Sequence, residues 1–188
     1  MADHPLKPLT ALGHDAARTV EIGPYRIVER FDVALASLAV RHGCEADLAR
    51  AAAAAGVPLA APARAEAAAH FSAFWVAPFM WMIEADFASH EDIAAHLKAV
   101  FGDLASITEQ TDAWIRFDIT AADLAPLFER LCNVDLGTAA VGFASRSVID
   151  HLGCYLIRRD AGEITLYGPR SSAQSLLHAL EVAAGSVI

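Results

Sequence analysis

The chain is poor in basic residues and in cysteine. Its 188 residues carry 14 Lys and Arg against 23 Asp and Glu, which gives a formal net charge of −9. An acidic chain repels phosphate backbones, so generic nucleic-acid binding is disfavoured. Three cysteines, Cys44, Cys132 and Cys154, are odd in number and widely spaced. We therefore expect buried structural thiols in a reducing compartment and no disulfide framework.

Long apolar runs and glycine-rich loops are also missing. The longest apolar stretch, residues 71–83, has 13 residues, whereas a membrane-spanning helix needs about 20. The first ten residues, MADHPLKPLT, lack the basic patch and apolar run of a signal peptide. The 11 glycines form neither G-x-G-x-x-G nor G-K-[ST], so a dinucleotide or nucleoside triphosphate is not expected. These features predict a cytoplasmic protein that contacts neither a membrane nor nucleic acid.

Apolar residues are abundant instead. They make up 55% of the chain, and the mean hydropathy is +0.37. This composition excludes a disordered protein, and it suggests that part of the surface is buried against another subunit. We expect residues 1–25, with their scattered Pro and Gly, to form an extended N-terminal arm, and residues 26–188 to form a single domain.

Hydrophobic periodicity and turn signals divide that domain into short strands and helices. Strands are predicted over residues 26–31, 34–41, 70–84, 105–110 and 113–119, with a hairpin of 146–159 and 163–167. Helices are predicted over 45–55, over 90–101, from about 121 and from about 173. Their caps are expected at Gly56 (C-terminal) and at Ser89, Thr120 and Ser171 or Ser172 (N-terminal). Residues 57–69 are predicted to be a loop.

A weak internal repeat relates two parts of the domain. The tetrapeptide Ala-Asp-Leu-Ala occurs at 46–49 and again at 122–125, each time at the start of a predicted helix that follows a strand. The repeat divides the domain into two related strand–helix–strand halves, at about 26–104 and 105–188. Hairpin-linked strands of this kind favour an α+β fold with a mainly antiparallel sheet.

Aromatic residues concentrate in one segment. Five of the twelve Phe and Trp residues lie within residues 71–81, and both faces of this segment are apolar, so it is expected to be covered on both sides. A ligand platform, a core strand and a subunit interface all fit this pattern. We select four candidate interface residues, Phe71, Trp75, Phe79 and Trp81.

No catalytic, cofactor-binding or metal-binding residue is assigned. Asp150, His151 and Cys154 form a D-H-x-x-C cluster, which fits a metal site or a Cys–His nucleophile. The favoured interpretation is a buried Cys and a surface or satisfied His in one strand. His90 and His96 on one helix would lie about 120° apart around its axis and would not share a face. Arg170 precedes the last helix, where it fits either an anion site with the free N–H groups or a solvated cap residue.

Several segments resemble the gamma subunit of heterotetrameric sarcosine oxidase. The match extends from about residue 34 to residue 184. The order and spacing of the motifs together carry the resemblance more than any single motif does. The matching segments are Ala34–Arg41, Ile107–Trp114, Arg116–Ile119, Leu131–Leu136 and Leu166–Ala173. This sequence departs from the family's usual Gly-Pro at Ala77-Pro78 and at Ala121-Ala122.

The resemblance implies a fold similar to the folate-binding domain of glycine-cleavage aminomethyltransferase, built from two related halves. It also implies a non-catalytic assembly role in a complex that oxidatively demethylates sarcosine to glycine. FAD, FMN, NAD, zinc and tetrahydrofolate would then belong to other subunits, and none to this chain. The partners would be larger alpha and beta flavoprotein subunits and a small zinc-binding delta subunit.

Other functions remain open. The same fold would suit a stand-alone folate-binding or one-carbon-transfer protein, although the strand that carries acidic residues in the folate enzymes has no carboxylate here, at residues 153–157. The chain would also suit a subunit of a related N-methyl amino acid dehydrogenase. A small hydrolase or metal enzyme would have to use Asp150, His151 and Cys154.

Overall fold

The computed structural model describes residues 7–188. Eleven strands form two sheets that face each other, and four α-helices pack on their outer faces. In chain order the elements are β1 (Thr19–Ile22), β2 (Tyr25–Arg30), β3 (Val33–Val40), α1 (Glu45–Ala55), β4 (Ala65–Ala67), β5 (Phe71–Ala77), β6 (Met80–Asp86), α2 (Ile93–Phe101), η1 (Gly102–Leu104), β7 (Ala105–Glu109), β8 (Trp114–Thr120), α3 (Ala125–Leu131), β9 (Ala144–Ile149), β10 (Leu152–Asp160), β11 (Glu163–Pro169), η2 (Arg170–Ser172) and α4 (Ala173–Gly185). The pairings between these strands are antiparallel, as the sequence predicted for an α+β fold.

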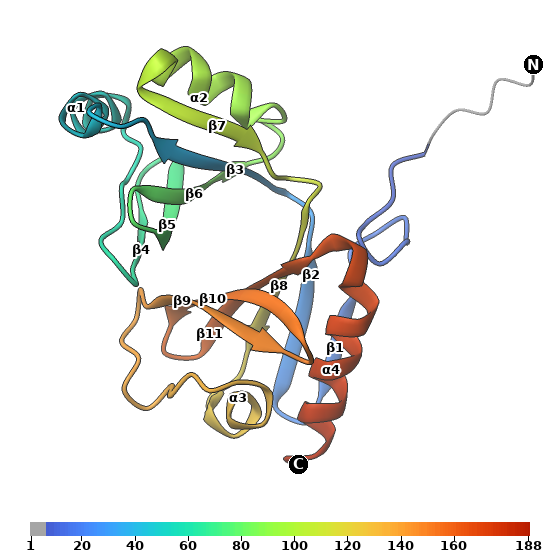
Figure 1. The fold of residues 1–188 in the computed structure, drawn as a ribbon. Helices are drawn as coiled ribbons and strands as arrows, with labels where there is room; N and C mark the ends of the chain where they lie inside the picture. The colour runs from blue at the N-terminus through green and yellow to red at the C-terminus, as the bar shows by residue number, and fades with distance from the viewer. Residues whose placement is uncertain (1–6) are drawn as a thin grey trace, which may run out of the picture.

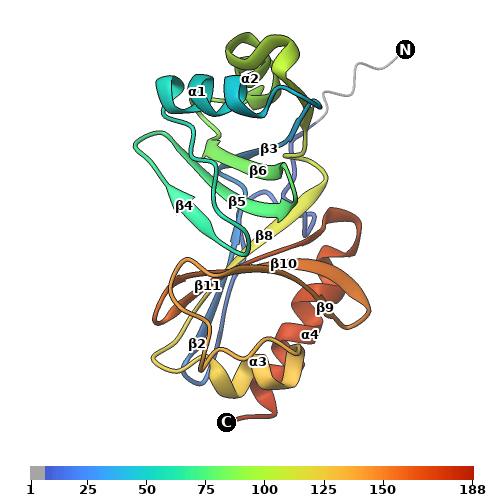
Figure 2. The same cartoon turned by 60° about the vertical axis from the view of Figure 1, so that its left-hand side comes forward.

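The elements stack in layers. Helices α1 and α2 cover the outer face of a five-stranded sheet, β4-β5-β6-β3-β7, and helices α3 and α4 cover the outer face of a six-stranded sheet, β1-β2-β8-β11-β10-β9 (Figure 1, Figure 2). Each helix–sheet pair encloses its own apolar core. A third, smaller cluster fills part of the space between the sheets, and Leu35, Phe74 and Tyr155 belong to it.

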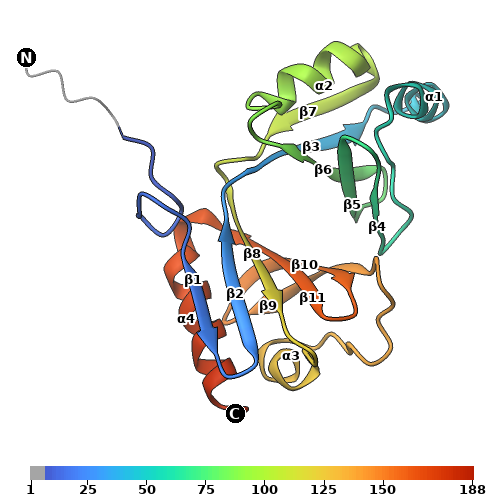
Figure 3. The same ribbon diagram turned by 180° about the vertical axis from the view of Figure 1, so that it is seen from behind.

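The two sequence halves exchange strands. Strand β2 lies early in the chain but pairs with β8 in the six-stranded sheet, whereas β7 pairs with β3 in the five-stranded sheet (Figure 3). The chain therefore crosses between the sheets twice, at 31–32 and at 110–113. Residues 19–22 of the expected N-terminal arm form β1, paired with β2, and residues 1–6 lie outside the described residues.

Local signals explain several of these elements. Helix α1 spans the predicted residues 45–55 and ends at Gly56, whose φ of 67° is left-handed and therefore suits a residue without Cβ. Gly168, at the end of β11, allows a close approach of the last helix. A Cβ at this position would lie 2.4 Å from Cδ2 of Leu176, so the Leu176 side chain or α4 would have to move to admit one.

Two helices begin later than predicted. Helix α2 begins at Ile93, because Asp92 is its N-cap and accepts a hydrogen bond from the Ala95 N–H at 2.9 Å. Ser89, the predicted cap, instead donates to Asp86, the last residue of β6. Helix α3 begins at Ala125 and not after Thr120, because Pro126 lies in its first turn, where the missing N–H costs nothing.

Two extended segments also differ from prediction. The predicted loop 57–69 contains the short strand β4, which pairs with β5. The predicted strand 146–159 is two strands, because Asp150 and His151 adopt φ values of 45° and 67° and form a two-residue hairpin turn. No helix in the described part of the chain is long and apolar enough to cross a membrane.

Candidate functional site

The candidate site begins with the polar face of β8. Strand alternation places Ile115, Phe117 and Ile119 on the face packed against α3 and α4. The opposite face carries Arg116 and Asp118, for which a half-buried strand predicts exposure to water. That prediction is wrong, since Asp118 is only 6% exposed. The five-stranded sheet covers this face, which a single strand's periodicity does not reveal.

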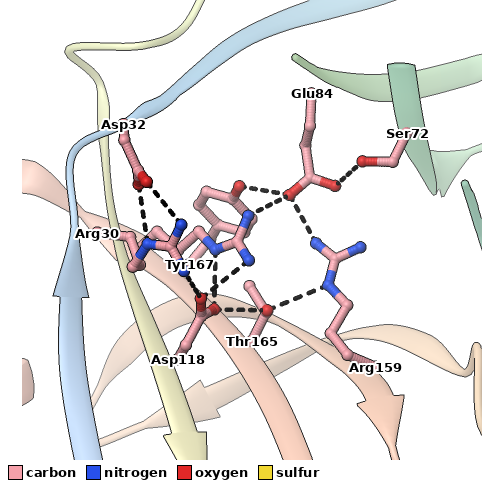
Figure 4. A network of polar contacts seen from close by, with 9 residues as sticks. Arg30, Asp32, Ser72, Glu84, Asp118, Arg159, Thr165 and Tyr167 are labelled. Atoms are coloured by element: carbon pink, nitrogen blue, oxygen red, sulfur yellow. Dashed lines mark hydrogen bonds and ion pairs between the residues drawn. The ribbon is translucent and has the colours of Figure 1, made fainter. Parts of the chain in front are cut away.

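Glu84 is the partner on the opposite sheet. Its Oε1 atom accepts hydrogen bonds from Arg159 Nη2 at 2.6 Å, from Tyr167 Oη at 2.6 Å and from Arg116 Nη1 at 3.2 Å. Its Oε2 atom accepts from Ser72 Oγ, the cross-strand neighbour on β5, at 2.7 Å. One carboxylate on β6 thus joins β8, β10 and β11 of the other sheet (Figure 4).

Asp118 is the second acceptor in the network. Its carboxylate accepts hydrogen bonds from Nε and Nη2 of Arg116 at 2.8 and 3.0 Å. It also accepts from the hydroxyl of its cross-strand neighbour Thr165 at 2.7 Å and from Nη1 of Arg30 at 3.1 Å. Arg30 also makes a two-pronged contact with Asp32, with distances of 2.8 and 2.6 Å. Figure 4 shows these groups converging between the sheets, where β2 leads into β3.

Formal charges balance in this network, and the pKa values follow from burial and pairing. Three guanidinium groups, those of Arg30, Arg116 and Arg159, face three carboxylates. Burial by itself raises the pKa of Glu84, but the charges of Arg159 and Arg116 outweigh it and lower the pKa to about 2. Burial, together with the charge of Glu84, raises the pKa of the Tyr167 hydroxyl well above its ordinary value.

The network is better suited to holding the two sheets together than to transferring protons. A carboxylate with a pKa of about 2 is a weak base at neutral pH, and general-base catalysis works best when the pKa is near the working pH. Every buried side-chain nitrogen and oxygen in residues 7–188 has a hydrogen-bond partner. The network is therefore saturated, and it crosslinks the two sheets.

A cavity of about 330 Å³ lies on one side of the network. Its lining includes Arg30, Arg116, Arg170, Trp114 and Tyr167, and residues 8–11 form one wall. Guanidinium groups beside aromatic rings are a suitable setting for a small aromatic carboxylate. A second hollow of about 320 Å³ lies on the other side and is lined partly by Glu84 and Ser72.

The chain preceding β1 is held in place by a third buried carboxylate, that of Glu29. Glu29 is 1% exposed and accepts hydrogen bonds from the backbone N–H groups of Leu12 at 3.1 Å and Arg18 at 3.0 Å. Arg170 donates to the carbonyl of Leu9 at 3.0 Å and lies 3.5 Å from Asp112. Arg170 therefore holds the N-terminal segment, a role that neither alternative from the sequence included.

Three of the four candidate interface residues come together. Trp75, Phe79 and Trp81 line one apolar groove of about 380 Å³ beside α1. Phe71 lies elsewhere: it is 6% exposed and belongs to the core beneath α2, so its part in an interface is withdrawn. Pro78 and Phe79 form the turn between β5 and β6, which explains why the predicted extended segment is interrupted there.

The D-H-x-x-C cluster separates in the structure. Asp150 and His151 are exposed in the β9–β10 turn, whereas Cys154 is fully buried in the core of the six-stranded sheet. Burial raises the pKa of the Cys154 thiol to about 11, which disfavours a nucleophilic thiolate. No group of three or more His, Cys, Asp and Glu in residues 7–188 has metal-binding geometry.

The two histidines at 90 and 96 do meet, contrary to the prediction. Their ring centroids are 4.9 Å apart, and both rings contact Phe71. The predicted 120° separation assumed that both residues lie on one helix. Because α2 begins at Ile93, His90 lies in the preceding turn and folds back over the first helical turn.

Sequence reasoning missed the network itself. Arg116, Asp118 and Tyr167 fall within the quoted family motifs but were not selected, and Glu84 is the last residue of the predicted strand 70–84. One signal was present: Arg116 and Asp118 alternate with apolar residues, and an i, i+2 pair of opposite charges on one strand face suits a cross-strand ion network.

Comparisons with known proteins identify the fold. No family model matches the sequence, and no curated protein does so. A chain of heterotetrameric sarcosine oxidase from Corynebacterium sp. U-96, solved in complex with pyrrole 2-carboxylate, is similar with a TM-score of 0.76 and 16% identity, over 87% of this chain and 85% of that one. Glycine cleavage system aminomethyltransferase T from Bartonella henselae is similar with a TM-score of 0.57 and 11% identity, over 81% of this chain and 44% of that one. The expected aminomethyltransferase-like fold is confirmed.

Proposed function

We propose that this chain is a non-catalytic, gamma-type subunit of a sarcosine oxidase complex. The observation that carries the proposal is the fold match to a sarcosine oxidase chain, which extends over most of both chains. The order of the sequence motifs, such as Ile107–Trp114 and Leu166–Ala173, supports the same assignment. The saturated network between the sheets is consistent with a rigid building block.

In this proposal the bond-breaking chemistry belongs to the partners. Larger alpha and beta flavoprotein subunits and a small zinc-binding delta subunit would carry FAD, FMN, NAD, zinc and tetrahydrofolate. The complex would be cytoplasmic, which agrees with three free cysteines, Cys44, Cys132 and Cys154. A dehydrogenase of another N-methyl amino acid with the same subunit plan is the nearest variant of this function.

Co-expression with candidate flavoprotein subunits from the same genome tests the proposal. We expect a stable complex in sedimentation velocity, with flavin absorbance co-migrating with this chain. We also expect oxidation of sarcosine, or of another N-methyl amino acid, by the complex and not by this chain alone. A chain that sediments alone beside folded flavoproteins, or that turns over substrate by itself, would refute the assignment.

Folate binding is the second candidate, and the cavity lined by Arg30, Arg116, Arg170, Trp114 and Tyr167 favours it, because folates combine an aromatic ring system with carboxylates. The guanidinium groups of this cavity already contact acceptors of the chain, so a folate would have to compete with them. Calorimetric titration with tetrahydrofolate decides the matter, and absence of heat at millimolar ligand removes this candidate.

A further inference from the structure

An apolar groove of about 380 Å³ lies beside α1, on the five-stranded sheet. It lies between the helix, the loop that follows it and the tip of the β5–β6 hairpin, and its lining includes Leu48, Leu59, Trp75, Phe79 and Trp81. The indole N–H of Trp81 donates to the carbonyl of Ala60 at 2.7 Å, which ties the loop to the sheet. The groove is therefore a preformed depression with a fixed wall.

Phe79 lies in this groove with an exposed apolar side chain, which does not stabilise the free chain. The residue is 58% exposed, so much of its apolar surface remains in water. Its φ is 61°, a left-handed conformation that an aromatic residue seldom adopts and that Gly or Asn would adopt with less strain. The left-handed φ belongs to the two-residue turn that joins β5 to β6. The exposed side chain does not stabilise the isolated chain, and it is explained if the ring packs against another molecule.

Two carboxylates lie at the groove, those of Glu45 and Glu66. Glu45 is the one charged residue among those that line it, and its carboxylate accepts from the N–H of Gly43. Glu66 lies on the same face of the sheet and accepts from the backbone of the loop wall at 3.4 Å. Neither carboxylate forms an ion pair within residues 7–188, while the neighbouring Arg41 and Arg50 are paired with aspartates.

We propose that this groove binds an apolar segment of a larger partner protein, flanked by Lys or Arg residues that pair with Glu45 and Glu66. The inference rests on the proposed subunit function and names the surface through which the chain assembles. Apolar contact around Phe79 would supply most of the binding energy, and the two carboxylates would select the partner.

Charge favours this occupant over two others. A second copy of this chain would bring the same acidic rim and a net charge of −9, so two copies would repel each other at this surface. An anionic lipid surface would be repelled for the same reason. A basic, apolar segment satisfies both the groove and its rim.

Site-specific photo-crosslinking in the producing cells tests the proposal with the full chain. The probe is p-benzoylphenylalanine at position 79, and the control carries the same probe at Val148, which is 61% exposed on the edge strand β9. We expect probe 79, and not probe 148, to crosslink one partner peptide that is apolar and flanked by Lys or Arg. The crosslinked peptide is sequenced by mass spectrometry.

Charge reversal provides a second, quantitative arm. The double variant Glu45→Lys, Glu66→Lys is expected to bind the crosslinked partner at least about tenfold more weakly. The matched control, Glu91→Lys with Glu129→Lys, changes two exposed carboxylates outside the groove and is expected to leave the affinity unchanged. Thermal melting of both variants shows whether they remain folded.

The outcomes separate this inference from the proposed function. A basic, apolar flavoprotein segment crosslinked at position 79 supports both. A basic, apolar segment of some other protein supports the groove while refuting the sarcosine oxidase assignment. A flavoprotein complex that forms without a crosslink at position 79 refutes the groove alone. An acidic peptide, a second copy of this chain or no crosslinked protein at all also refutes it, as does unchanged affinity of the folded double variant.

Discussion

Replacing Glu84 by Gln is the most informative perturbation of the network between the sheets. The amide keeps the shape of the side chain and removes the charge that faces Arg159 and Arg116. Two guanidinium groups would then lose an anionic partner in a site where Glu84 is only 2% exposed. Breaking a buried ion pair from one side typically costs about 3–5 kcal/mol, because the remaining charge is buried without compensation.

The pKa of Glu84 leads to an independent magnitude. The pKa falls from an ordinary value of 4.5 to about 2 in the folded chain. A shift of one pKa unit corresponds to about 1.4 kcal/mol, so the ionised carboxylate stabilises the fold by about 3 kcal/mol. Because the folded pKa is the lower one, this stabilisation is complete above about pH 5 and is lost as the pH falls towards 2.

Urea unfolding, followed by tryptophan fluorescence between pH 7 and pH 2.5, measures both effects. At pH 7 the Glu84→Gln variant should be less stable by about 3 kcal/mol or more, and its stability should fall less steeply below pH 5 than that of the wild type. Both proteins should still lose some stability in acid, because both contain Asp32, whose pKa is lowered by the hydrogen bond from Arg30. The matched control is Glu91→Gln, an exposed carboxylate outside the network. Equal stability of Glu84→Gln and wild type at pH 7, or parallel acid curves, would refute the reasoning.

Three further predictions concern other parts of the fold. Gly168→Ala should lower the free energy of unfolding by about 1–3 kcal/mol, because its Cβ collides with Leu176, whereas Gly185→Ala, with open space around it, should be neutral or slightly stabilising in thermal melts. Glu29→Gln should speed hydrogen exchange at the two backbone amides that its carboxylate accepts from, without comparable change in the helices. Cys154 should react with a disulfide reagent only after unfolding, since it is fully buried and burial raises the pKa of its thiol to about 11; rapid labelling of three thiols in the native chain would contradict this.

The sequence predicted those elements whose cause is local. The alternation in residues 113–119 predicts a strand, and the Ala-rich run ending at Gly56 predicts a helix, because side-chain period and cap chemistry act within a few residues. The predictions that failed depended on choices between neighbouring signals. Asp92 outcompeted Ser89 as a cap, and a two-residue turn divided one long apolar segment at Asp150.

The candidate site was only partly predictable. Trp75, Phe79 and Trp81 were selected because aromatic density is visible in the sequence, and they do share one groove. Phe71 has the same residue type but points beneath α2, where the tertiary fold buries it. Composition indicates that such apolar side chains are buried against something. It does not show whether they pack against a helix of the same chain or against another protein.

By itself, the amino-acid sequence determined the α+β class, the antiparallel strands and the apolar face of each element, since these follow from periods of two and 3.6 residues along the chain. Only the tertiary structure decided that β2 and β7 exchange sheets and that Glu84 meets Arg116 and Arg159. The physical reason is distance along the chain. The partners of a buried charge lie 32 and 75 residues away, and only the docking of two sheets removes the water that would otherwise solvate them.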